Sequence, residues 1–225
     1  MTYDTTKDPR IIVAHLACNL LQKCVKQKTA VPVKVPRDKI TELVSACQSA
    51  VMTLMYMYQE PGALASAAPL LTLAEAVQAM AGAYEKLLGG KDDHSLLRAT
   101  IRWCLRTLHG LPGRFANSGT TLAAGVDLVV VQVRNAAPGG NFLKTIVTDG
   151  KADYTVVTNL TGLKTHAKLA AAFLPPREIG GTVSEAMFLG SGLRTEATGT
   201  VLSDKQADAA EAAAILYDEV AKHPK

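Results

Sequence analysis

The stretch from Asp153 to Ser191 constrains the fold of this chain more than any other. It contains short apolar segments rich in Val, Ala, Phe and Met, separated by Asn-Leu-Thr-Gly, Pro-Pro and Gly-Gly. Apolar segments that alternate closely with turn signals are typical of the strands of a small all-β domain. Two similar segments lie upstream. We therefore predict five strands, at Asp127–Arg134, Phe142–Thr148, Tyr154–Leu160, Lys168–Leu174 and Ser184–Leu189.

Three motifs in this region carry a resemblance to a known family. They are Val-Val-Thr-Asn-Leu at Val156–Leu160, Leu-Pro-Pro at Leu174–Pro176, and Gly-x-x-Ser-Glu-Ala-Met-x-Leu at Gly181–Leu189. Over residues 126–192 the chain resembles the tRNA-binding domain found as a free-standing bacterial dimer, in methionyl-tRNA synthetases and in endothelial monocyte-activating polypeptide. The resemblance implies a five-stranded, partly open Greek-key barrel, the oligonucleotide/oligosaccharide-binding (OB) fold. It also implies tRNA binding, and a homodimer or a synthetase partner.

The chain departs from this family in the loop before the last strand. Arg177, displaced by one position, is the basic residue that remains there. Where the family has Asn, two Lys and Arg, this chain has Phe173, Pro175, Glu178 and Gly180.

The first half of the chain has the periodicity of helices rather than strands. Apolar residues recur at three- and four-residue spacings, interrupted by Pro61-Gly62 and Gly89-Gly90. We predict an antiparallel helical bundle over residues 1–113, with helices over 8–28, 36–59 and 70–88 and a fourth that is capped by Asp92 or Asp93 and closed at Gly110. A linker over 114–125 should join it to the barrel at 126–192, and a C-terminal extension over 193–225 should carry a helix at 204–222. The fold class is thus α+β with two domains.

Composition supports a folded protein without a membrane anchor. The 225 residues are 48% hydrophobic and 20% charged, which allows real cores. Each apolar run is shorter than the roughly 18 residues of a membrane span, and the polar N-terminus lacks a signal-peptide apolar region. We expect a cytoplasmic protein that does not bind membranes.

Known catalytic and metal-binding templates are absent from the sequence. It contains no P-loop, no His-Glu-x-x-His, no Gly-x-Ser-x-Gly and no Cys-x-x-Cys spacing. His15 and Cys18 lie one helical turn apart, but nothing supplies a third, orienting group. We predict no enzyme activity, no metal and no cofactor. The four cysteines are interpreted as buried thiols of an intracellular protein, with a disulfide as the alternative in a hyperthermophile.

Two sets of residues are candidates for RNA binding. Arginines at i, i+4 and i+8 on the fourth predicted helix share one face and could follow a phosphate backbone, although such a stripe can also be a solvated face paired with acids. In the barrel, polar residues on the second and third strands and their loops are best placed to touch RNA. The resemblance adds hydrogen bonds from Ser184 and Glu185 and an apolar contact from Met187, with barrel core and strand entry as their structural alternatives. The full set is Arg98, Arg102, Arg106, Arg134, Lys144, Asn159, Lys164, Arg177, Ser184, Glu185 and Met187.

These observations predict a non-enzymatic RNA-binding protein of translation, for tRNA or another structured RNA. Residues 1–115 carry 14 Lys and Arg against 9 Asp and Glu, so the helical half should supply much of the charge. The alternative is a protein-interaction module that docks on a synthetase or the ribosome through the apolar segment Phe173–Pro176. A third possibility is an enzyme or ligand-binding protein of unknown type.

Overall fold

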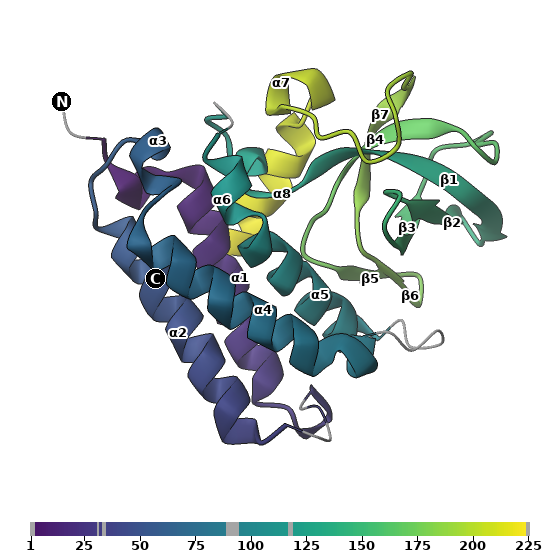
Figure 1. Ribbon diagram of the computed structural model, residues 1–225. Helices are drawn as coiled ribbons and strands as arrows, with labels where there is room; N and C mark the ends of the chain where they lie inside the picture. The colour runs from purple at the N-terminus through teal and green to yellow at the C-terminus, as the bar shows by residue number, and fades with distance from the viewer. Residues whose placement is uncertain (1–2, 31, 33–34, 89–94, 117–118, 224–225) are drawn as a thin grey trace.

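The structure, a computed structural model, places a helical region beside a sheet, with the C-terminal helix against both (Figure 1). It describes residues 3–30, 32, 35–88, 95–116 and 119–223. The helical region consists of η1 (Thr5–Lys7), α1 (Pro9–Val25), η2 (Lys28–Ala30), α2 (Arg37–Met55), α3 (Pro61–Leu64), α4 (Ala68–Leu88), α5 (Leu96–His109), α6 (Leu111–Arg114) and η3 (Leu122–Gly125).

Local signals account for several helix ends. Asp8 caps α1, because its Oδ1 accepts a hydrogen bond from the Arg10 N–H at 2.8 Å, and Pro9 occupies the first turn. Helix α5 begins after Ser95, whose hydroxyl accepts a bond from the Arg98 N–H. The predicted cap at Asp92 or Asp93 and the predicted stop at Gly89-Gly90 lie outside the described residues.

The long helices pack around one apolar core. Helix α1 contacts α2 and α5, and α4 contacts the same two helices. Leu16, Leu54, Met80 and Ile101 are fully or almost fully buried between them. All four cysteines are buried and form no disulfide, as predicted.

The second half of the chain forms a five-stranded antiparallel sheet and a separate hairpin. The strand order in the sheet is β3-β2-β1-β4-β7, and β5 pairs with β6. All five predicted positions contain strand residues, although β1 extends well beyond Arg134 and the last predicted strand is divided. The bounds are β1 (Leu128–Gly139), β2 (Phe142–Thr148), β3 (Asp153–Thr158), β4 (Lys168–Ala172), β5 (Arg177–Ile179), β6 (Thr182–Ser184) and β7 (Met187–Leu193).

The predicted barrel is wrong, because the sheet stays open between its two edge strands, β3 and β7. Ser184 and Glu185 hold the β3 edge instead. The Glu185 N–H donates to the Thr155 carbonyl at 2.9 Å, Glu185 Oε2 accepts from the Thr155 N–H at 3.1 Å, and Ser184 Oγ accepts from the Val157 N–H at 3.0 Å. Side chains thus occupy positions that a closing strand would need, and no ladder joins β3 to β7 within the described chain. We call the gap between these edges the seam.

The sheet is buried on both faces where β1 begins. Leu128 and Val130 belong to the core shared with the helices, whereas Val129, Val131 and Val133 belong to a second cluster with Phe173 and Phe188. Because side chains alternate between faces, this run of valines must be apolar throughout. The sheet therefore rests directly on the helical region.

The C-terminal helix predicted over 204–222 is present as two pieces, α7 (Asp204–Ala207) and α8 (Ala210–Ala221). Asp208 breaks it, with a left-handed φ of 49°. Ser203 and Gln206 form a capping box at the start of α7. Helix α8 contacts α1, η3 and β7, so it lies between the two halves of the molecule. In the described ranges, every helix is too short or too polar to cross a bilayer.

The predicted linker contains ordered structure in its described part. Residues 122–125 form η3, and Leu122, Ala123 and Val126 are buried in the core shared with the helices. The division into domains stays a prediction.

Candidate functional site

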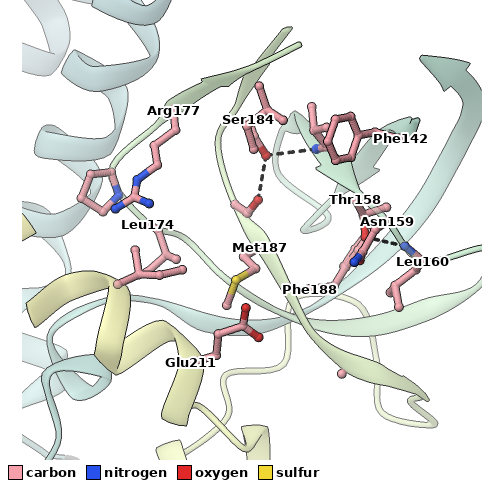
Figure 2. A pocket seen from close by; sticks show the side chains of 16 residues that line it. Phe142, Thr158, Asn159, Leu160, Leu174, Arg177, Ser184, Met187, Phe188 and Glu211 are labelled. Carbon is pink, nitrogen blue, oxygen red and sulfur yellow. Dashed lines mark hydrogen bonds between the residues drawn. The ribbon is translucent and has the colours of Figure 1, made fainter. Parts of the chain in front are cut away.

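A groove of about 360 Å³ follows the seam (Figure 2). Its walls come from β2 and the end of β3 on one side, and from β7 and α8 on the other, with the β5–β6 hairpin at one end. Figure 2 shows Phe142 and Asn159 on the first side and Met187 and Glu211 on the second. The groove exists because the two edges of the sheet do not pair.

The lining of this groove is mainly apolar, with a few polar groups whose hydrogen bonds are already made. Ser184 Oγ donates to the Ala186 carbonyl at 3.0 Å as well as accepting from Val157. Thr158 Oγ1 accepts from the Leu160 N–H at 3.2 Å. Arg177 forms an ion pair of 2.7 Å with Glu219 of α8.

Four of the predicted RNA-binding residues, Asn159, Arg177, Ser184 and Met187, meet at this groove. Asn159 directly follows β3, and the other three come from β5, β6 and β7. Met187 is half-buried beside the core shared with the helices, so it also has the packing role that the sequence left open.

Three other predicted residues, Arg134, Lys144 and Lys164, are exposed cations of the sheet half, and we call them the cationic surface. Lys144 of β2 is in register with Val157 of β3, which lines the groove. Arg134 lies in the bulge of β1. The loop that carries Lys164 is bonded to the adjacent Val133, because the His166 N–H donates to the Val133 carbonyl and the Val133 N–H donates to the Ala167 carbonyl. None of the three cations forms an ion pair within the described chain.

The arginine stripe of α5 faces the sheet rather than solvent. Arg102 forms an ion pair of 2.6 Å with Glu185, and Trp103 Nε1–H donates to the Phe173 carbonyl at 3.0 Å. Arg106 contacts Asp127 at 2.6 Å and Asp149 at 2.9 Å, and its guanidinium lies 3.7 Å from the centroid of the Phe173 ring. Arg102 and Arg106 are thus paired with acids, as one sequence interpretation allowed, and these acids come from the sheet half and not from a neighbouring helix.

The electrostatics of this junction between α5 and the sheet favour the charged forms of its arginine and aspartate side chains. Burial alone would lower the pKa of Arg106, but Asp127, Tyr154 and Asp149 together raise it. Burial likewise raises the pKa of Asp127, and this is outweighed by Arg114 and Arg106, so the net pKa is lowered. Burial raises the pKa of Tyr154 to about 12 despite Arg106. At neutral pH Arg106 and Asp127 are therefore charged, whereas Tyr154 is a neutral phenol.

At this junction the side chains of Glu185, Arg102 and Arg106 are already engaged in ion pairs. Glu185 is 6% exposed and shared between Arg102 and the Thr155 N–H. Arg98, at the other end of the stripe, is half-buried and also has an interaction partner. The RNA-binding roles predicted for these residues stay predictions.

A second group of basic residues lies between Lys23 and Lys39 in the helical region, and some of these side chains already have partners. Arg37 donates to the carbonyls of Val25 and Lys26 at the end of α1, and Lys39 pairs with Glu42. Lys34 lies outside the described residues.

The described residues contain no group of three or more His, Cys, Asp or Glu side chains that could hold a metal ion. Burial raises the pKa of the Cys24 thiol to about 11 and that of Cys47 to about 12, which opposes thiolate formation.

Glu211 is the groove residue that sequence reasoning missed. It lies in the first turn of α8, eighteen residues beyond the end of β7, and its exposed carboxylate forms no hydrogen bond or ion pair within the described chain. No sequence pattern links an acid on a weakly amphipathic helix to a distant strand edge. Only the packing of α8 against β7 brings them together.

Comparison with known proteins corrects the family predicted from the sequence. No tRNA-binding OB-fold family matches the chain, and the sheet does not close into a barrel. The motifs at Val156–Leu160, Leu174–Pro176 and Gly181–Leu189 are short, and they describe strands and turns that occur in this open sheet as well. The synthetase, ribosome and homodimer predictions stay predictions.

No curated protein matches the chain significantly. A family model described as an alpha helical domain matches residues 1–118, slightly more than half of the chain. This match covers the helical region through α6 and stops short of η3 and the sheet. The chain belongs to this alpha helical domain family.

Proposed function

We propose that the protein binds RNA, with the phosphates along the cationic surface of Arg134, Lys144 and Lys164 and unpaired bases directed toward the groove. One observation carries the proposal. These three cations are exposed and have no acidic partner in the described chain, and Lys144 lies beside an apolar groove. Cations of this kind are available to neutralise phosphates and release counterions, which is the main source of nucleic-acid affinity.

The distribution of charge in the sheet half supports the proposal. Between Leu128 and Pro176 the only acids are Asp149 and Asp153, and Asp149 is paired with Arg106. Five basic residues occupy the same stretch: Arg134, Lys144, Lys151, Lys164 and Lys168. The acids of this half concentrate after Pro176, in the hairpin, in the segments on either side of β7 and in the C-terminal helices. The half is therefore close to neutral in sum but positive over β1 to β4.

The predicted alternative, a protein-docking module, has less support. It relied on an apolar edge at Phe173, Leu174, Pro175 and Pro176, and all four residues are buried. They pack in the cores of the molecule, and the Phe173 carbonyl accepts the Trp103 indole N–H. Little of this segment is left for a partner protein.

Fluorescence anisotropy with labelled total tRNA and with short single-stranded RNA tests the proposal. We expect binding at 50 mM salt that weakens steeply toward 200 mM. Replacing Arg134, Lys144 and Lys164 together by Gln should weaken binding by about tenfold or more and lower the salt slope by about 2 for single strands, at roughly 0.7 for each phosphate contact.

The matched control replaces Lys26, Lys39 and Lys205, three exposed lysines outside this surface, by Gln. It should retain most of the affinity. Equal losses in the two variants would show only general charge attraction, and the absence of any shift with either RNA would refute the proposal.

A further inference from the structure

Two polar side chains of the groove are unused. The Asn159 amide and the Glu211 carboxylate line opposite walls, are exposed, and make no hydrogen bond or ion pair within the described chain (Figure 2). Their neighbours Ser184, Thr158 and Arg177 are all occupied. A ligand in the groove therefore meets one carboxylate acceptor and one amide that can both donate and accept.

The rest of the groove is suited to a flat, apolar group. Val157 and Leu160 line one wall, Met187 and Ile215 the other, and Phe142 stands near the rim with 39% of its surface exposed. The volume of about 360 Å³ is in the range of roughly 300–1,000 Å³ of small-molecule sites. A nucleobase combines two apolar faces with a hydrogen-bonding edge, which matches this lining.

An extended peptide fits the seam less well. Peptides add to open sheets by pairing with the free groups of an edge strand. On the β3 edge, the Thr155 N–H and carbonyl and the Val157 N–H are already bonded to Ser184 and Glu185. Because these groups are not available for a new ladder, the open edge alone does not favour a peptide.

The position of Lys144 connects the groove to the cationic surface. Lys144 pairs in register with Val157, so a phosphate held by Lys144 lies next to a base that enters beside Val157. Specific RNA recognition usually acts on such unpaired bases, through stacking and through hydrogen bonds to their edges.

We propose that the groove binds one unpaired nucleobase and prefers bases with an exocyclic amino group. Glu211 accepts a hydrogen bond from that amino group, as carboxylates do from cytosine N4, while Asn159 bonds to the remaining edge. Uracil has a carbonyl at the corresponding position, which faces the carboxylate unfavourably. This inference rests on the proposed RNA binding.

Cytidine and uridine octamers provide the sharpest test, because their bases differ at the 4-position, amino against carbonyl. We expect the wild-type protein to bind the cytidine octamer about tenfold more tightly than the uridine octamer. Glu211→Gln should abolish this preference, since a carboxamide can donate to the uracil carbonyl. Asp218→Asn, an exposed change on the same helix α8 and outside the groove, should leave the preference intact.

A second readout keeps the outcome unambiguous. In NMR spectra, cytidine monophosphate should shift the Asn159 side-chain amide and the Met187 methyl signals more than uridine monophosphate does. Equal binding of both octamers by wild type and Glu211→Gln, with these signals unmoved, would overturn the base site while leaving RNA binding intact. Failure of both octamers and total tRNA to bind would overturn the proposed function and the base site together.

Discussion

Two groups of cations in this protein have the same formal charge but opposite surroundings. At the junction between helices and sheet, Arg106 and Arg114 share Asp127, and Arg102 pairs with Glu185. On β1 and β2, Arg134 and Lys144 are exposed and lack acidic partners in the described chain. The sequence offered both groups as candidates for RNA contact. The fold separates them, because availability depends on where the carboxylates lie.

The largest test of this contrast is Arg106→Met. Removing one partner of a largely buried ion pair leaves Asp127 and Asp149 undercompensated, so we expect a loss of about 3 kcal/mol in the free energy of unfolding. Urea denaturation measures it. Arg134→Met is the matched change on the outer surface and should cost less than about 0.5 kcal/mol. Similar losses for the two variants would remove the distinction between the groups.

Acid should weaken the junction by a smaller amount, because a protonated carboxyl can still accept a hydrogen bond from Arg106. The folded-state pKa values of Asp127 and Asp149 lie below their ordinary value, so the unfolded chain binds these protons first. The stabilisation is complete above about pH 4, the unfolded pKa of Asp, and is lost as the pH falls through the folded values. Urea midpoints between pH 6 and pH 3 measure the loss. Arg106→Met should flatten this dependence, and an unchanged slope would contradict the assignment.

Trp103→Phe tests a neutral contact at the same junction. The change leaves the buried Phe173 carbonyl without the indole donor, for which we expect a loss of about 1–2 kcal/mol. Thermal unfolding at neutral pH measures it. The loss should persist at pH 3, unlike that of Arg106→Met, because no titrating group is involved.

The smallest expected effect on stability is that of Lys144→Gln together with Lys164→Gln. Both side chains are exposed and unpaired, so the free energy of unfolding should stay within about 0.5 kcal/mol of wild type. RNA affinity and its salt dependence should fall nonetheless. A protein that loses stability and affinity together would show that these lysines serve the fold.

Local patterns predicted much of the secondary structure. The helix predicted over 8–28 and the one predicted over 204–222 begin where expected, because their caps, Asp8-Pro9 and Ser203, depend on a few neighbouring residues. The apolar strands were found because their burial on two faces requires continuous valines and alanines. The break at Asp208 was missed, since a left-handed aspartate between two alanine-rich turns carries no strong signal.

Long-range contacts explain the remaining errors. The closed barrel failed at Ser184 and Glu185, whose side chains bond to β3 where a ladder was expected, and this choice depends on Arg102 from the helical region. The composition of the groove also depends on long-range contacts. Asn159 and Arg177 were identified as site residues, but Glu211 arrives only through the packing of α8, which the sequence of the strands does not encode.

The left-handed turn at Asp208 determines where the last helix packs, although the sequence of that helix is only weakly amphipathic. It redirects the chain so that α8 buries Ala212 and Leu216 in the core and forms one wall of the groove. A fragment trimmed after β7 would keep the strand order of the five-stranded sheet and still lose Glu211 and Ile215 from the groove. Deletion mapping based on strand boundaries would therefore misjudge the limits of the groove.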